Sequence, residues 1–147
     1  MTAIHRSALL PYSSRKLYDL VNDVESYPAF MDGCVGAEVL SVDERHMRAR
    51  LDLSRGGISQ SFTTINELTP GERIHLRLAE GPFDSFDGIW QFISLAPEAC
   101  KVALDLEFKM RGGLLGAAAS RLIDGVTTNL VGAIVRRAEV VYGGAHG

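Results

Sequence analysis

The sequence is poor in the residues that metal sites and disulfide frameworks require. Of its 147 residues only two are cysteines, Cys34 and Cys100. A domain of this size does not need a disulfide, so the sequence predicts two free and mostly buried thiols. The four histidines show no metal-ligand spacing, and no Cys-x-x-Cys motif occurs. No metal site is predicted.

Motifs of nucleotide binding and of nucleophilic catalysis are also missing. The sequence has no Gly-x-Ser-x-Gly elbow, no GxxxxGK[ST] loop and no GxGxxG fingerprint. The glycine pairs that follow Arg55 and Arg111 are explained by turns. Four tyrosines could act as acids, but nothing in the sequence activates them. We therefore predict a protein that is not an enzyme and needs no cofactor.

The chain has neither a basic excess nor a long apolar run. Its 15 Lys and Arg against 18 Asp and Glu give a formal net charge of −3. This charge supplies no global positive field for nucleic acid, so DNA binding is not predicted. The start of the chain has no signal-peptide pattern, and charged residues interrupt the apolar segment near the end. We expect a cytoplasmic protein that at most contacts the inner membrane peripherally.

The sequence does contain segments in which apolar and polar residues alternate. The clearest is 102–110, where Val102, Leu104, Leu106, Phe108 and Met110 share one face. Similar or less regular segments lie at 2–9, 37–42, 47–53, 58–65, 74–78 and 86–95, with turn signals between them. This pattern predicts an antiparallel sheet of six or seven strands, mostly a meander, with one face exposed to solvent.

Helices are predicted at only a few places. Ser13 is a good N-cap for a helix that runs to about Asn22, and Asp23 is a candidate cap for a short helical turn. From Leu114 to Tyr142 apolar residues recur at spacings of three and four, which predicts one long helix. Gly143-Gly144 is expected to end this helix with a left-handed residue.

The predicted sheet is much wider than the long helix. Strands about 4.8 Å apart make a sheet roughly 30 Å wide, whereas a helix is about 10 Å across. The sheet must therefore curl around the helix. The space between them is either filled by aromatic side chains or remains as a cavity. We predict a single α+β domain over residues 1–147, with a curved antiparallel sheet around a long C-terminal helix.

The segment VNDVESYPAFMDGC at 21–34 is more apolar than connecting segments usually are. With the preceding LLPYSSRKLYDL it resembles the opening of RatA-type bacterial proteins and their mitochondrial coenzyme-Q-binding relatives, in the START-like (polyketide cyclase/dehydrase) superfamily. The resemblance continues through GGISQSFTTINEL at 56–68, EGPFDSFDGIWQF at 80–92 and the last helix. It implies the helix-grip (START/Bet v 1-like) fold, with an apolar pocket between sheet and helix.

The resemblance implies two functions. The coenzyme-Q-binding relatives imply that ubiquinone or a related isoprenoid lipid is held in the pocket unchanged, supporting respiration. The RatA-type proteins imply a toxin that binds the large ribosomal subunit and blocks subunit joining. RNA binding is expected to require a positive face, and this chain is acidic overall. We therefore rank binding of a quinone or lipid first and ribosome association second.

The predicted ligand site combines aromatic residues of the matching segments with the apolar stripe of the long helix. Its residues are Tyr27, Phe30, Phe62, Phe83, Trp90, Phe92, Leu115, Ala119, Leu122 and Val126. The inward face at Trp90 depends on strand parity, because a slip of one residue reverses the face. Access is expected through 24–31 and the turn at 81–83.

Overall fold

The computed structural model describes residues 2–112 and 114–143, except the side chains of Leu114 and Leu115. In this part of the chain the strands are β1 (Thr2–Leu10), β2 (Cys34–Val42), β3 (His46–Arg55), β4 (Ile58–Thr69), β5 (Arg73–Glu80), β6 (Phe83–Ala96) and β7 (Ala99–Met110). The α-helices are α1 (Ser14–Asn22), α2 (Leu114–Thr128) and α3 (Leu130–Tyr142), and a 3₁₀ helix, η1, spans Val24–Ala29.

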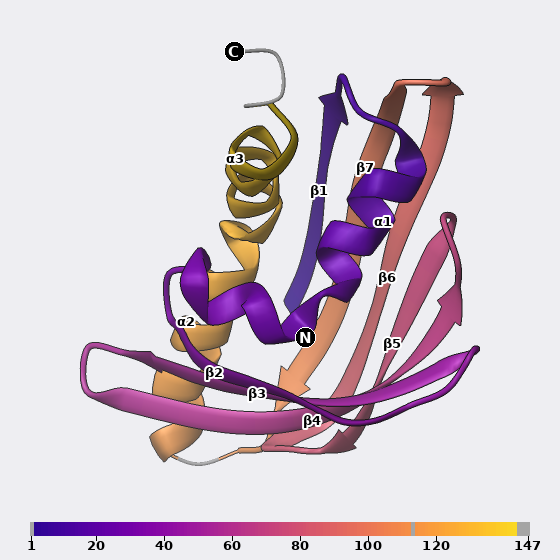
Figure 1. The fold of residues 1–147 in the computed structure, drawn as a ribbon. Helices are drawn as coiled ribbons and strands as arrows, with labels where there is room; N and C mark the ends of the chain where they lie inside the picture. The colour runs from indigo at the N-terminus through magenta and orange to yellow at the C-terminus, as the bar shows by residue number, and fades with distance from the viewer. Residues whose placement is uncertain (1, 113, 144–147) are drawn as a thin grey trace.

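The strands form one antiparallel sheet in the order β1-β7-β6-β5-β4-β3-β2. From β2 to β7 the chain is a simple meander, and β1 is added beside β7. Figure 1 shows the sheet curling, so that β2, β3 and β4 cross the lower part of the molecule, below η1, while β1, β6 and β7 rise above them. The predicted curved antiparallel sheet of six or seven strands is confirmed, with seven strands.

The two faces of the sheet differ as the alternation predicts. On β7 the side chains of Val102, Leu104, Leu106 and Phe108 are buried, while those of the charged residues between Leu104 and Met110 are exposed. The outer face carries ion pairs such as Arg77–Glu67, whose nitrogen and oxygen lie 3.1 Å apart. Exposed pairs of this kind contribute little stability, so the fold depends mainly on the buried face.

The first helix and the segment after it cover the open side of the sheet. The Ser13 hydroxyl accepts a hydrogen bond from the Lys16 backbone N–H at 3.2 Å, which confirms the predicted cap. Asp23 does not cap the backbone of η1; its carboxylate accepts from the Ser26 hydroxyl instead. The 3₁₀ helix is tied to the edge strand β2, since Glu25 accepts from the Val39 backbone N–H at 3.1 Å.

The C-terminal helix differs from the prediction, because it is divided into α2 and α3 at Asn129. The Thr127 hydroxyl donates to the Ile123 carbonyl at 2.7 Å, and the Asn129 amide donates to the Gly125 carbonyl at 3.0 Å. Side chains that bond helix carbonyls in this way compete with the backbone ladder and bend helices. Both pieces nevertheless pack against the sheet, α2 on β1, β3, β4 and β7, and α3 on β1 and β7.

The predicted left-handed helix end is wrong at Gly143, whose φ of −69° and ψ of −34° are right-handed. Gly144 lies outside the described residues. The two cysteines are free and buried, as predicted. Burial raises the pKa of both thiols, which keeps them protonated at neutral pH.

Candidate functional site

A cavity lies between the inner face of the sheet and the bend between α2 and α3. It leaves about 70 Å³ open to water-sized molecules. Ligand pockets usually measure about 300–1,000 Å³, so the structure shows a nearly closed grip. The aliphatic part of its wall comes mainly from three strands, β3, β5 and β7, as Ala49, Leu51, Leu76, Leu104 and Leu106.

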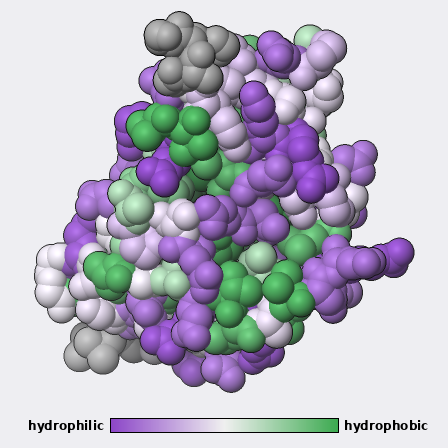
Figure 2. All heavy atoms as spheres, viewed as in Figure 1, coloured by the Kyte–Doolittle hydropathy of each residue, from purple (hydrophilic) through white to green (hydrophobic). Residues whose placement is uncertain are grey.

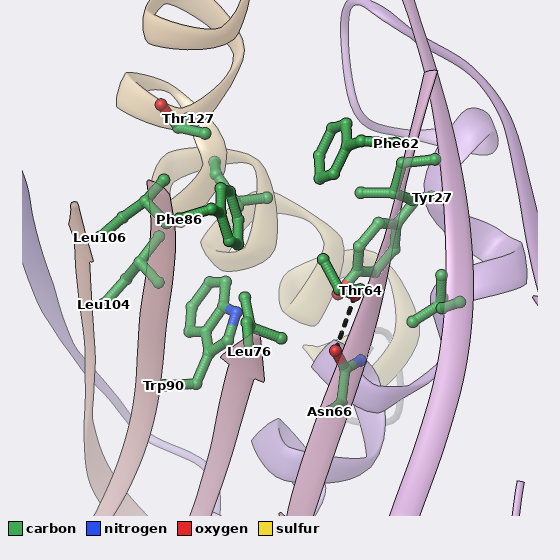
Figure 3. A pocket seen from close by; sticks show the side chains of 14 residues that line it. Tyr27, Phe62, Thr64, Asn66, Leu76, Phe86, Trp90, Leu104, Leu106 and Thr127 are labelled. Carbon is green, nitrogen blue, oxygen red and sulfur yellow. Dashed lines mark hydrogen bonds between the residues drawn. The ribbon is translucent and has the colours of Figure 1, made fainter. Parts of the chain in front are cut away.

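Aromatic rings form much of the remaining wall. Phe62, Phe86 and Trp90 come from the sheet, and Tyr27 comes from η1, which closes one side (Figure 3). The Phe62 and Phe86 rings contact each other with centroids 5.7 Å apart. Val24 of η1 lies on the same wall, so the apolar segment between the first helix and β2 does cover the cavity.

Polar groups on the wall are few and mostly paired. The Thr64 hydroxyl donates to Oδ1 of Asn66 at 2.7 Å, the dashed line in Figure 3. The Thr127 hydroxyl is paired with a carbonyl of α2, and the Tyr27 hydroxyl with the Val21 carbonyl. Burial holds the pKa of Tyr27 far above its usual range, so this hydroxyl remains a neutral donor.

The wall contains no Asp, Glu, His, Lys or Arg among the residues that the structure describes. Acid–base or nucleophilic chemistry needs an activated group within reach of the bound molecule. The single titratable group on the described wall, the Tyr27 hydroxyl, is already engaged. This arrangement is suited to holding a neutral molecule.

The structure brings three of the predicted ligand residues, Tyr27, Phe62 and Trp90, to the cavity wall. Trp90 faces inward while Gln91 is exposed, so the predicted strand parity is confirmed. The described residues that do not line the cavity are Phe30, Phe83, Phe92, Ala119, Leu122 and Val126. The side chain of Leu115 lies outside the described residues.

The predicted residues that miss the wall lie around it. Phe83 is buried behind Phe62, with ring centroids 5.5 Å apart, and Phe92 stacks on Trp90 at 6.2 Å. Phe30 is half-buried at the edge of η1, below the Arg137 guanidinium. Ala119, Leu122 and Val126 are buried on α2. The wall instead takes Thr127 and Leu130, because the cavity lies at the bend of the helix.

The sequence interpretation missed the two polar residues on β4, Thr64 and Asn66. Both are buried and share the inward face with Phe62 and Leu68. Counting every second residue from Phe62 would have found them. Their polarity hid the signal, because an inward strand position is expected to be apolar.

A family model described as polyketide cyclase/dehydrase and lipid transport matches residues 10–135. The chain belongs to this family. The aromatase/cyclase Zhui of Streptomyces sp. R1128 has a similar structure, with a TM-score of 0.81 over 94% of this chain and 93% of that one. At 16% sequence identity this similarity shows the fold alone. It confirms the predicted helix-grip arrangement.

Relatives within the family separate the two predicted functions. The ribosome association toxin RatA of Pseudomonas aeruginosa is 46% identical over 97% of this chain and 99% of its own length. The mitochondrial coenzyme Q-binding protein COQ10 homolog B of Xenopus laevis is 26% identical, over 93% of this chain and 58% of its own length. The resemblance seen in the sequence is confirmed, but the comparison favours the function that the sequence ranked second.

Among the described residues, no helix is both long and apolar enough to cross a membrane.

Proposed function

We propose that this protein associates with the ribosome. The observation that carries the proposal is the 46% identity to a ribosome association toxin over nearly the full length of both chains. The identical positions at this level outnumber the buried residues, so some of them lie on the surface, where a macromolecular partner is contacted. Such association would place the protein in the cytoplasm.

The exposed face of α2 and α3 offers candidate contacts to ribosomal RNA. Arg121 and Arg136 are exposed there, and neither forms an ion pair within the described part of the chain. Arg55 reaches the same face from β3, where its guanidinium lies against Gly125, but it is already paired with Asp32 at 2.6 Å. Arginine side chains on phosphates supply most of the affinity of non-specific RNA and DNA contacts. Arg137 is less suitable, because its guanidinium packs 5.2 Å from the Phe30 ring centroid.

Co-sedimentation with purified ribosomes tests this proposal. The wild-type protein should pellet with the large subunit at low salt and dissociate as salt rises. The double variant Arg121→Glu/Arg136→Glu should lose the association. Arg73→Glu/Lys101→Glu makes the same change in net charge on the outer face of the sheet and should keep it. Failure of the wild-type protein to pellet at low salt would refute the proposal.

The cavity supports a second function, the binding of an apolar molecule. Its wall is apolar apart from Thr64, Asn66, Thr127, the Trp90 indole N–H and the engaged Tyr27 hydroxyl. A prenyl chain placed there would gain about 0.8 kcal/mol for each buried CH₂ group. Because the cavity now leaves about 70 Å³, a lipid or quinone requires η1 to move away from the sheet.

The surface next to η1 is suited to delivering such a molecule. On the face that carries η1 and β2, apolar surface is interspersed among polar residues (Figure 2). The edge strand β2 exposes Val35, Leu40 and Val42. These side chains provide an apolar route between a membrane surface and the cavity.

Native mass spectrometry of protein purified from its own host tests the second function. The expected result is a co-purifying isoprenoid quinone or other neutral lipid, unchanged after release. A mass equal to that of the bare chain, with no binding of added apolar probes, would contradict it. The arginine variants above should still bind the apolar molecule, because the two functions use separate parts of the protein.

A further inference from the structure

Two nearly buried residues on the cavity wall carry hydrogen-bond donors that bond no other group in the described part of the protein. Asn66 is 4% exposed and Trp90 is 2% exposed. The Asn66 carbonyl oxygen accepts from Thr64, but no hydrogen bond involves Asn66 Nδ2 or Trp90 Nε1. In Figure 3 the Asn66 amide oxygen points toward Thr64, and the indole nitrogen of Trp90 turns toward the side where Thr64 and Asn66 lie.

The other polar side chains on the wall accept no hydrogen bond from these donors in the described part of the protein. The Tyr27 and Thr127 hydroxyls donate to backbone carbonyls. Neither nitrogen is among the fully buried side-chain atoms that lack a partner, so both still face space that a small polar atom can enter. Both groups without a partner are donors, since an indole or amide N–H cannot accept, whereas each hydroxyl on the wall already takes part in a hydrogen bond.

We propose that the cavity takes a neutral apolar molecule with a carbonyl oxygen, such as a ketone, quinone or ester. The inference rests on the apolar-ligand function proposed above. Asn66 Nδ2 and Trp90 Nε1 donate to the carbonyl oxygen or oxygens, and the hydrocarbon part lies against Phe62 and Phe86. A carboxylate or phosphate is disfavoured, because the described wall has no cation to offset the loss of its hydration.

Three small probes that require the least widening of the cavity test this inference. Acetophenone and isopropylbenzene have nearly the same shape, but only acetophenone has a carbonyl oxygen. Benzoate adds a negative charge. Trp90 is the only tryptophan, so its indole N–H gives a single NMR signal. Acetophenone should move this signal downfield, whereas isopropylbenzene should not, and benzoate should not bind.

Two variants identify the donor. The measured quantity is the ratio of the affinities for acetophenone and isopropylbenzene. We expect this ratio to be about tenfold or more higher in wild-type protein than in Asn66→Leu. The reason is that a site built to hydrogen-bond a group discriminates against analogues that lack it. Thr63→Val is the matched control. Thr63 is a buried threonine on the same strand as Asn66 but does not line the cavity, so the preference should stay as in wild-type protein.

The outcomes separate the inference from the function on which it rests. If isopropylbenzene binds, and the preference for acetophenone is the same in wild-type protein as in Asn66→Leu, the carbonyl inference is overturned while apolar binding stands. If neither binds, both fail. Binding of benzoate in preference to acetophenone would overturn the requirement for a neutral molecule. The wild-type indole shift decides the question even where Asn66→Leu does not fold.

Discussion

Filling the cavity from β3 should make the protein more stable. Ala49 is 2% exposed, lies on the cavity wall and is paired with Thr64 across the sheet. The change Ala49→Val adds two methyl groups that point into the cavity, and valine is favoured in strands. The backbone therefore has no reason to move, and the new atoms occupy space that is now empty.

The size of the effect follows from the cavity volume. An empty cavity costs about 24 cal/mol per Å³, so 70 Å³ corresponds to about 1.7 kcal/mol. Two methyl groups fill part of this space and should raise the free energy of unfolding by about 1 kcal/mol. In a chain of this length that gain raises Tm by about 3 °C.

Urea and thermal denaturation measure this gain. The matched control is Ala103→Val on β7, since Ala103 is 5% exposed and does not line the cavity. There the added methyl groups meet packed atoms, and stability should stay constant or fall. If Ala49→Val is no more stable than Ala103→Val, the reasoning from empty volume is refuted. Ribosome co-sedimentation should be unchanged in both variants.

Three further predictions concern single residues. Gly33→Ala should lower the free energy of unfolding by about 2–3 kcal/mol, because φ is +90° and the new Cβ would lie 2.7 Å from a valine methyl group of α2. Gly57→Ala is the control, because φ there is +82° but a new Cβ would meet open space, and it should cost only about 1 kcal/mol. Equal losses in the two variants would contradict the steric argument. The hydrogen bond from Arg50, and secondarily one from a serine hydroxyl, lowers the pKa of Asp52. The ionised Asp52 carboxylate contributes less than about 1 kcal/mol to the free energy of unfolding. This contribution is present above the unfolded pKa of about 4 and is lost as pH falls through the folded pKa. Between pH 5 and pH 3, urea titrations should therefore show a smaller loss of stability for Asp52→Asn than for wild-type protein. Tyr27→Phe removes a buried hydrogen bond to the last turn of α1 and should cost about 1 kcal/mol, with faster amide exchange across η1 as the measured sign and unchanged exchange as the contrary result.

The sheet could be predicted from the sequence because each strand has its own period-two pattern. The run from Val102 to Met110 contains five apolar residues on one face, and the structure buries that face. Turn residues between the segments fixed the meander. The division of the C-terminal helix could not be predicted in this way, because the apolar stripe continues through Asn129. It depends on which carbonyls the Thr127 and Asn129 side chains bond.

The candidate site was less accessible to sequence reasoning than the fold. Aromatic residues were the natural choice for a pocket, and Phe62 and Trp90 do reach the cavity. Phe83 and Phe92 belong to the same clusters but form a second layer behind them. Which ring lies in front depends on side-chain packing between neighbouring strands. That packing is a property of the whole sheet and is not visible in any one segment.

The position of β1 in the sheet has a consequence for how the chain folds. Every other strand pairs with a neighbour in sequence, whereas Leu10 pairs with Cys100 and Thr2 with Phe108. Closing such a long loop is slow compared with forming a hairpin. During synthesis the first strand emerges at once but must wait for the last strand before it can bond. The nascent chain therefore carries an unpaired strand edge until translation is nearly finished, and its folding is expected to depend on protection from aggregation during that interval.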